Sequence, residues 1–232
     1  FQVPDEKIEI PVSKVWEDNN NKAGKRPESV TFVLSGNGEE YELTLESSKI
    51  ADGSTIEQWT GKFTDLPKYD ENGDEIVYTL SEKDTGSIFY TSENTVIDQD
   101  ARIVTNTFEV PDERIEIPVT KTWNDNNNEA QKRPESVTFV LTGNGQNYEL
   151  TLESSNIENG TTVEQWTGKF TNLPKYDANG DEITYTLSEK DTGNIFYTSE
   201  NTIVEQDTKT VTNKFEVPDE RIEIPVMKVW ND

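Results

Sequence analysis

The chain has 232 residues, with 46 acidic and 21 basic side chains, and its formal net charge is −25. Because a surface that binds phosphates needs clustered Lys and Arg, this charge argues against nucleic acid as a partner. The sequence contains neither Cys nor His, which excludes disulfides, His-ligated zinc and catalysis by a Ser-His-Asp triad.

A motif near the start of the chain identifies an internal repeat. Residues 8–16, Ile-Glu-Ile-Pro-Val-Ser-Lys-Val-Trp, return almost unchanged at 115–123 and again at 222–230. Such self-similarity at a fixed spacing is typical of repeat proteins. The sequence therefore predicts two complete domains and the first strand of a third, incomplete repeat, at residues 1–108, 109–215 and 216–232.

Each complete repeat is expected to consist of short β-strands. Segments rich in β-branched and aromatic residues alternate with turns, and none has the pattern of a long amphipathic helix. Gly36-Asn37-Gly38 and Asn72-Gly73 are typical of hairpin turns, where positive φ is needed. About seven strands in roughly one hundred residues indicate an all-β fold of the Ig-like sandwich type. The strands predicted in the first repeat are 8–16, 30–35, 41–46, 57–63, 76–82, 88–92 and 102–108.

Three polar residues of the first repeat occupy positions that should face the core. Side chains alternate between the two faces of a strand. On that basis Lys14 lies on the apolar face of the first strand, Glu82 on that of the fifth, and Asn106 on that of the last. The matching residues of the second repeat are Lys121, Glu189 and Asn213.

Two interpretations of these buried residues stay open from the pattern alone. One is a buried Lys–Glu ion pair with the Asn as a hydrogen-bonding neighbour, because an unpaired buried charge is costly. The other is chemical, because desolvation lowers the pKa of a Lys and raises that of a Glu. A neutral amine could then attack the Asn carboxamide, while a protonated Glu polarises the carbonyl and passes protons to the leaving ammonia. The product would be a Lys–Asn isopeptide bond.

Five motifs carry a resemblance to a known family. In kind, order and spacing they resemble the B-repeat (Cna B-type) domains of collagen adhesins and related surface proteins of Gram-positive bacteria. The resemblance covers both full repeats and the partial third. The motifs are Lys-Val-Trp-Glu-Asp-Asn-Asn at 14–20, Lys-Arg-Pro-Glu-Ser-Val at 25–30, Leu-Pro-Lys-Tyr at 66–69, Tyr-Thr-Leu-Ser-Glu at 78–82 and Val-Thr-Asn-Thr-Phe at 104–108.

This resemblance implies a reverse-Ig-like, Greek-key-like β-sandwich in each repeat. It also implies one intramolecular isopeptide bond per repeat, formed in a single turnover. Lys228 matches the Lys of the motif, but its partners would lie beyond Asp232, so we expect it to form no such bond within this chain. The implied bonds are Lys14 to Asn106, promoted by Glu82, and Lys121 to Asn213, promoted by Glu189.

The family resemblance further implies a structural function. In the family, such repeats are spacers that project a separate ligand-binding region from the cell wall. We therefore expect stalk repeats of an extracellular adhesin, anchored to the wall outside this sequence, with no turnover activity and no cofactor. The expected partners are other repeats and a distal ligand-binding region of the same polypeptide, and a host matrix protein through the parent adhesin. We expect a monomer, without membrane insertion.

A directly ligand-binding or calcium-binding adhesive module is the alternative function. The loops at 70–75 and 177–182 superficially resemble calcium loops. Their Gly comes too early for an EF-hand and the downstream Glu is misplaced, which favours hairpin turns and no metal. A glycosidase with paired carboxylates is disfavoured, because 46 acidic residues make chance pairs inevitable.

Overall fold

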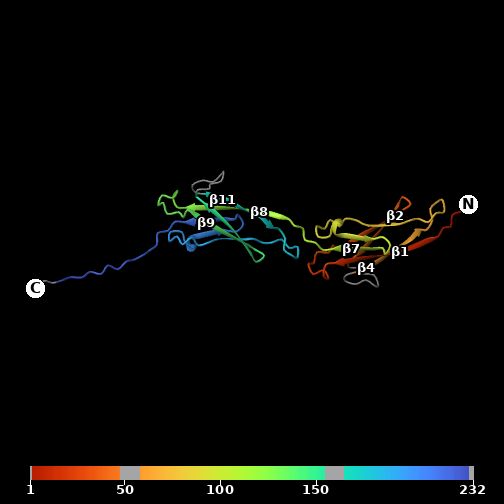
Figure 1. The fold of residues 1–232 in the computed structure, drawn as a ribbon, viewed down its shortest axis with the longest axis horizontal. Coiled ribbons are helices and arrows are strands. Elements are labelled where there is room, and N and C mark those ends of the chain that lie inside the picture. Colours follow the sequence, from red (N-terminus) through yellow and green to blue (C-terminus); the bar gives the residue numbers. More distant parts are fainter. Residues whose placement is uncertain (1, 48–57, 155–164, 230–232) are drawn as a thin grey trace. The chain divides into compact units, whose positions relative to one another are not determined.

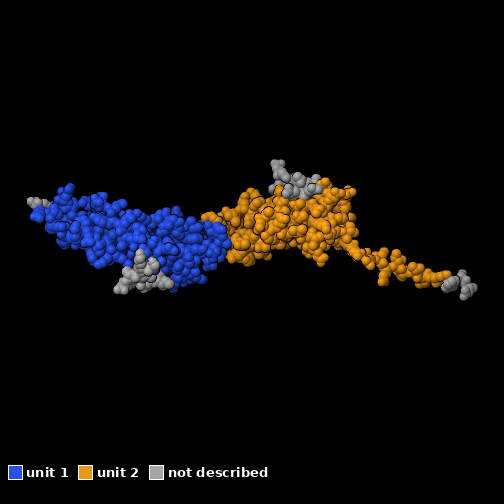
Figure 2. Space-filling view, turned by 180° about the vertical axis from the view of Figure 1, so that it is seen from behind, with its two compact units in different colours: residues 1–112, 176–182 blue, residues 113–175, 183–232 orange. Residues whose placement is uncertain are grey.

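The computed structural model describes residues 2–47, 58–154 and 165–229 (Figure 1). The chain forms two compact units (Figure 2). Unit 1 comprises residues 1–112 with 176–182, and unit 2 comprises residues 113–175 with 183–232. The domain boundaries predicted after residues 108 and 215 remain a proposal.

Unit 1 is a sandwich of two β-sheets. One sheet has four strands in the order β4-β1-β7-β6, and the other has three in the order β3-β2-β5. The predicted all-β sandwich of about seven strands is confirmed. The strands are β1 (Lys7–Glu17), β2 (Ser29–Gly36), β3 (Glu39–Glu46), β4 (Gln58–Pro67), β5 (Thr79–Glu82), β6 (Thr95–Asp98) and β7 (Ile103–Thr107), and a short 3-10 helix (Ser92–Asn94) precedes β6.

Unit 2 has the same architecture. Its sheets have the orders β11-β8-β14-β13 and β10-β9-β12. Among the described residues, no helix is long and apolar enough to cross a membrane. The strands are β8 (Arg114–Asn124), β9 (Ser136–Gly143), β10 (Gln146–Glu153), β11 (Gln165–Pro174), β12 (Thr186–Glu189), β13 (Thr202–Glu205) and β14 (Thr210–Lys214), with a 3-10 helix (Ser199–Asn201) before β13.

The first strand of unit 1 lies in the middle of the four-stranded sheet. β1 pairs antiparallel with β4 and parallel with β7, so it lies between them in the sheet. The parallel register runs from Ser13 opposite Ile103 to Glu17 opposite Thr107. This pairing brings the first and last strands of the unit side by side.

Apolar side chains from both sheets fill the space between them. The ring of Trp16 lies 5.2 Å from that of Trp59 and 5.1 Å from that of Tyr90, both in T-shaped contacts, which aromatic pairs prefer. These rings form the end of the core that lies closest to Lys14 and Asn106. The core residues of unit 1 are Val12, Trp16, Val30, Phe32, Leu34, Trp59, Phe63, Leu66, Tyr78, Leu80, Tyr90 and Val104.

A side-chain amide completes the hydrogen bonding of β5. The Gln99 side chain accepts a hydrogen bond from the Leu80 N–H at 2.8 Å and donates one to the Leu80 carbonyl at 2.7 Å. Arg102 donates to the Tyr78 carbonyl at 2.8 Å. Because a buried strand edge must satisfy its backbone groups, these side chains replace a neighbouring strand and keep Glu82 in position.

The predicted strand at residues 88–92 is wrong. This segment forms bends that lead into the 3-10 helix, and Ile88 is exposed. The Asn94 side chain accepts a hydrogen bond from the Thr91 N–H at 2.7 Å and donates to the Phe89 carbonyl at 3.1 Å. These local bonds replace strand pairing, and the strand lies further along the chain, at β6.

Two other predicted strands have different boundaries. The strand predicted at 76–82 begins only at Thr79, as β5. The predicted alternation of buried residues is correct, because Tyr78 and Leu80 are both buried. The strand predicted at 57–63 extends to Pro67 as β4, and its predicted first residue, Glu57, lies outside the described residues.

The segment after β14 forms no strand over residues 216–229. Its apolar residues are exposed, with Ile224 at 74 % and Val226 at 91 %. In unit 1 the same motif is held by β4 and β7. The assignment of this segment to a third repeat remains a proposal.

Gly36, at the end of β2, lies against the ring of Tyr78. A Cβ on Gly36 would approach Tyr78 Cδ1 to 2.6 Å and Ile76 Cγ2 to 2.8 Å. Overpacking of this kind costs about 1–3 kcal/mol, so we expect Gly36→Ala to lower the free energy of unfolding by that amount in guanidinium denaturation. Ser35→Ala is the control and should change it by less than about 0.5 kcal/mol. Equal losses for both variants would contradict the packing argument.

Candidate functional site

Three polar side chains predicted to face the core of unit 1 do meet there. Lys14 is 0 % exposed and Asn106 is 1 % exposed. In the parallel register of β1 and β7, Lys14 lies opposite Val104, and Trp16 lies opposite Asn106. Glu82, at the end of β5, reaches them from the opposite sheet, with its side chain 6 % exposed.

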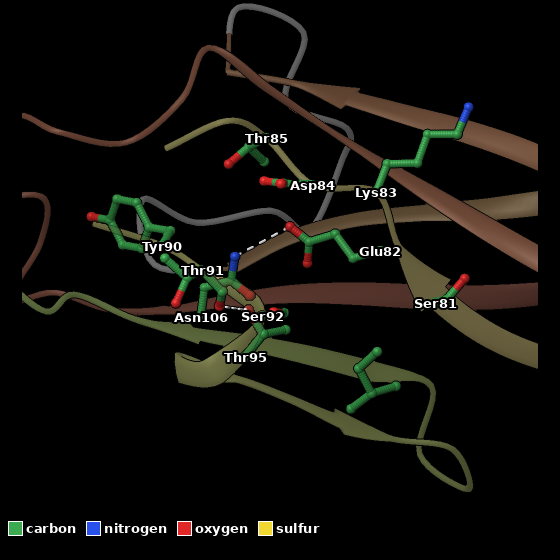
Figure 3. Close-up of a pocket in the computed structure, with 11 residues that line it drawn as sticks. Ser81, Glu82, Lys83, Asp84, Thr85, Tyr90, Thr91, Ser92, Thr95 and Asn106 are labelled. Atoms are coloured by element: carbon green, nitrogen blue, oxygen red, sulfur yellow. Dashed lines mark hydrogen bonds between the residues drawn. The ribbon is translucent and has the colours of Figure 1, made fainter. Parts of the chain in front are cut away.

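The Glu82 carboxyl group contacts both of the other side chains. Its Oε2 lies 3.2 Å from Lys14 Nζ. Its Oε1 accepts a hydrogen bond from Asn106 Nδ2 at 3.2 Å, drawn as a dashed line in Figure 3. The amide nitrogen of Asn106 faces the carboxyl group, whereas a Glu that polarises the carbonyl, as predicted from the sequence, would contact the oxygen. One carboxyl group thus bridges the amine and the carboxamide nitrogen.

Several buried polar atoms of this site have no hydrogen-bond partner among the described residues. In unit 1 they are Lys14 Nζ, Trp16 Nε1, Glu82 Oε2 and Asn106 Oδ1. Lys14 Nζ and Glu82 Oε2 are within ion-pair distance without hydrogen-bond alignment. Since buried polar groups are nearly always satisfied, a cluster of unsatisfied atoms needs an explanation.

The burial of the site shifts the pKa values of both titratable groups in the directions that favour their uncharged forms. Desolvation lowers the pKa of Lys14 to about 8, although the nearby Glu82 opposes this shift. Desolvation also raises the pKa of Glu82, against the opposing effects of Lys14 and Asn106. The low-dielectric surroundings therefore favour a neutral amine and a protonated carboxyl group.

Unit 2 repeats the arrangement at its three predicted residues. Asn213 Nδ2 donates to Glu189 Oε1 at 2.9 Å, and Lys121 Nζ lies 3.6 Å from Glu189 Oε2. Desolvation lowers the pKa of Lys121 to about 8 and raises that of Glu189. Lys121 also donates to the Thr122 carbonyl at 3.3 Å. The seventh predicted residue, Lys228, lies on the exposed segment after β14.

A second buried polar cluster lies next to the site and was not predicted from the sequence. Arg26 forms a two-pronged ion pair with Asp18, and the Tyr90 hydroxyl donates to Asp18 Oδ2 at 2.8 Å. Burial alone would raise the pKa of Asp18, but the hydrogen bonds from Arg26, the Asn21 backbone and Tyr90 lower it overall. Asp18 and Arg26 lie in two of the family motifs, which was the available signal.

This cluster is connected to the site through Trp16. The Arg26 guanidinium lies 5.2 Å from the Trp16 ring centroid, and Lys14 Nζ lies 4.4 Å from the same centroid. Unit 2 has the same contacts around Trp123, from Arg133 at 5.2 Å and Lys121 at 4.0 Å. Asp125 and Tyr197 complete the cluster there.

A pocket of about 260 Å³ opens beside Glu82 and Asn106 (Figure 3). Tyr90 and Thr95 are among the residues that line it. The corresponding pocket of unit 2, of about 160 Å³, is lined in part by Glu189 and Tyr197. A small neutral molecule released at the site therefore has a route to solvent.

The two loops that resemble calcium loops are stabilised internally. Asp70 Oδ1 accepts backbone hydrogen bonds from Asn72 and Asp74, both at 2.9 Å. Asp177 does the same for Asn179 and Asp181. These bonds lower the pKa of Asp70 and of Asp177. In the described part of the chain, no group of three or more acidic, His or Cys residues could hold a metal ion.

The sequence matches the family described as Cna protein B-type domain at residues 10–107 and 117–214. The collagen adhesin of Staphylococcus aureus is 34 % identical to this chain over 233 residues. That alignment covers 99 % of this chain but only 17 % of the adhesin.

Two solved structures of repeats from the same organism are also similar in sequence. A single B repeat unit (B1) of the collagen binding surface protein is 33 % identical, with 90 % of this chain and 99 % of that chain covered and a TM-score of 0.36. The two-repeat structure (B1B2) is 32 % identical, with 91 % and 50 % covered and the same TM-score of 0.36.

The lowered lysine pKa predicts how stability depends on pH when no cross-link can form. The Asn106→Ala/Asn213→Ala protein should become more stable between pH 8 and 10. In this range the unfolded chain holds protons on Lys14 and Lys121, with pKa 10.5, that the folded chain has lost at about 8. Urea denaturation at several pH values measures the slope.

Replacing both lysines in that background, by Lys14→Met and Lys121→Met, is the control and should remove the rise. Tyrosine ionisation in the unfolded chain, with an unperturbed pKa of 10.0, is common to both proteins and cancels in this comparison. A rise of stability with pH that persists after the lysine substitutions would contradict its assignment to Lys14 and Lys121.

Proposed function

The chain belongs to the Cna protein B-type domain family, and from that premise we propose that each unit closes itself with one Lys–Asn isopeptide bond. Unit 1 joins Lys14 to Asn106 with Glu82 as the proton-transfer group. Unit 2 uses Lys121, Asn213 and Glu189 in the same roles. The units act as repeats in the stalk of a bacterial surface adhesin.

The reaction is an amide exchange in which every atom is accounted for. The Lys14 Nζ lone pair attacks Asn106 Cγ, and the carbonyl π electrons move onto Oδ1. Glu82 accepts a proton from Nζ at Oε2 and gives its own proton to Nδ2 from Oε1. The carbonyl re-forms as the Cγ–Nδ2 bond breaks. Ammonia leaves through the adjoining pocket, and Glu82 returns to its starting protonation state.

The positions of the three side chains and the protonation states of Lys14 and Glu82 together account for the rate of the amide exchange. The folded unit holds the amine and the carboxamide against one carboxyl group, which replaces a bimolecular encounter by an intramolecular one. An amine with a pKa of about 8 is partly neutral at physiological pH and therefore nucleophilic. Burial raises the pKa of Glu82, which favours the protonated form that can supply a proton to the leaving nitrogen.

The unsatisfied buried atoms are the observation that supports this proposal most directly. A permanent Lys–Glu ion pair would be expected to align its hydrogen bonds, because unmet buried charges are costly. Here Lys14 Nζ, Glu82 Oε2 and Asn106 Oδ1 are all buried without a hydrogen-bond partner among the described residues, although the first two lie 3.2 Å apart. Formation of the bond converts the amine into a neutral amide and removes the cost of burying its charge.

The bond would make unit 1 resistant to tension. β1 and β7 are parallel neighbours at the beginning and end of the unit, so a force on its ends acts along both strands. A covalent link between them carries that force and bypasses the residues between. This suits an extracellular spacer between the cell wall and a distal ligand-binding region, and it survives reducing conditions because it contains no disulfide.

The mass of the intact protein tests the proposed bond. Folded wild-type chain should lack two ammonia masses relative to the sequence, and Glu82→Gln should restore one, because it removes the acid while keeping side-chain volume. Glu42→Gln is the control, because Glu42 is an exposed residue that pairs with Lys83. This variant should keep the full deficit of two ammonia masses. A wild-type chain at its full sequence mass would falsify the proposal.

The same bond should stabilise unit 1 against unfolding. It closes a loop of roughly 90 residues, which by analogy with a disulfide stabilises by about 4–5 kcal/mol through the unfolded chain. We expect Asn106→Ala and Glu82→Gln to lose similar amounts in guanidinium denaturation, since both block the bond. A loss confined to Asn106→Ala would assign the effect to packing instead.

A further inference from the structure

We propose that the indole N–H of Trp16 donates a hydrogen bond to Asn106 Oδ1 when negative charge develops there during bond formation, and that Trp123 does the same for Asn213. This inference rests on the proposed function. It adds to Lys, Glu and Asn a fourth participant, an oxyanion-stabilising donor.

The first observation is a buried donor without an acceptor, present in both units. Trp16 and Trp123 are each 2 % exposed. Their Nε1 atoms have no hydrogen-bond partner in the described parts of the chain. A buried Trp N–H usually finds a partner. The same rare exception at equivalent positions of two separately folded units indicates that the donor is kept for a later partner.

The second observation is an unpartnered acceptor on a neighbouring residue. Asn106 Oδ1 is also buried without a partner among the described residues, as is Asn213 Oδ1. Trp16 is the register partner of Asn106 across the parallel β1–β7 pair, and Trp123 is that of Asn213. Paired residues of adjacent strands present their side chains to the same face. Each unit therefore contains one unmet donor and one unmet acceptor on a pair of neighbouring residues.

Bond formation brings the acceptor towards the indole. Lys14 Nζ lies 4.4 Å from the Trp16 ring centroid. The new bond places Asn106 Cγ about 1.3 Å from Nζ, with its oxygen about 1.2 Å further on. The carbonyl oxygen is thereby held close to Lys14 Nζ, which itself lies over the Trp16 ring. In unit 2, Lys121 Nζ is 4.0 Å from the Trp123 centroid.

The timing of this contact favours catalysis. Attack by Nζ pushes the carbonyl electrons onto Oδ1, which becomes an oxyanion until the Cγ–Nδ2 bond breaks. A donor that is unpaired before the attack and paired during it stabilises the transition state selectively. Such a donor is most effective when it needs no reorganisation.

The indole is held in place by its neighbours. Trp59 and Tyr90 contact it in T-shaped geometry, and the Arg26 guanidinium lies 5.2 Å from its centroid. Arg26 is itself fixed by its ion pair with Asp18, to which Tyr90 also donates. Through these contacts, the cluster of Asp18, Arg26 and Tyr90 fixes the direction of the Trp16 N–H.

Cell-free translation of the full chain provides the test. Trp16 is replaced by Phe, or by benzothienylalanine, which keeps the bicyclic shape but has sulfur in place of the N–H. Translation is stopped, and loss of ammonia from each unit is followed by mass spectrometry of peptides that contain β1 and β7. We expect both variants to slow bond formation in unit 1 on the order of 10²-fold, the usual loss for one oxyanion donor.

Unit 2 of the same molecule is the internal control and should react at the wild-type rate. Phe63→Leu is the packing control, because its ring lies in the same core but is not one of the rings that the argument uses to hold Trp16, and it should change the rate of unit 1 only a few-fold. A benzothienylalanine variant that reacts at the wild-type rate overturns the inference, even if Trp16→Phe is slow. A wild-type chain that never loses ammonia overturns the proposed function itself.

Nuclear magnetic resonance supplies a second readout that does not depend on rates. After bond formation the carbonyl oxygen of the new amide should accept the Trp16 N–H. The indole proton of wild-type chain should then exchange more slowly with solvent than that of Glu82→Gln, which keeps Trp16 but forms no bond in unit 1. Equal exchange in the two proteins overturns the inference.

Discussion

The buried amine of Lys14 is the constraint on which the rest of each unit depends. Its position on the core face of β1 follows from strand alternation, between Val12 and Trp16, which are both buried. Such an amine must lose its proton, pair or react, because a desolvated charge is too costly to keep. Glu82 at the end of β5 and Asn106 on β7 meet that requirement from both sheets.

The polar groups around this amine form two connected layers. Glu82 and Asn106 contact each other beside the amine, and Asp18, Arg26 and Tyr90 lie beyond the Trp16 ring. The outer layer is fully paired, whereas the inner layer keeps unmet donors and acceptors among the described residues. A satisfied network can hold a fixed geometry around an unsatisfied site. This division explains why both layers recur in both units.

The composition is consistent with a unit that depends on a covalent link. The chain has no Cys and only 31 % hydrophobic residues, and its net charge of −25 opposes compaction. A bond between the first and last strands would compensate for the few hydrophobic residues and the charge repulsion, because it restricts the unfolded chain. It would do so without needing an oxidising environment. Membership of the Cna protein B-type family and the 34 % identity to a collagen adhesin agree with an adhesin repeat.

Strand alternation and the internal repeat were sufficient to predict the all-β class and to select Lys14, Glu82 and Asn106, because parity along a strand is a local property. The segment 88–92 was misassigned because the Asn94 side chain competes with strand pairing, which composition does not reveal. Only the tertiary structure decided that β1 and β7 are parallel neighbours, that one carboxyl group bridges two nitrogens, and that Asp18, Arg26 and Tyr90 converge on Trp16. These contacts join residues far apart in the chain, so they depend on how the two sheets pack rather than on any local pattern.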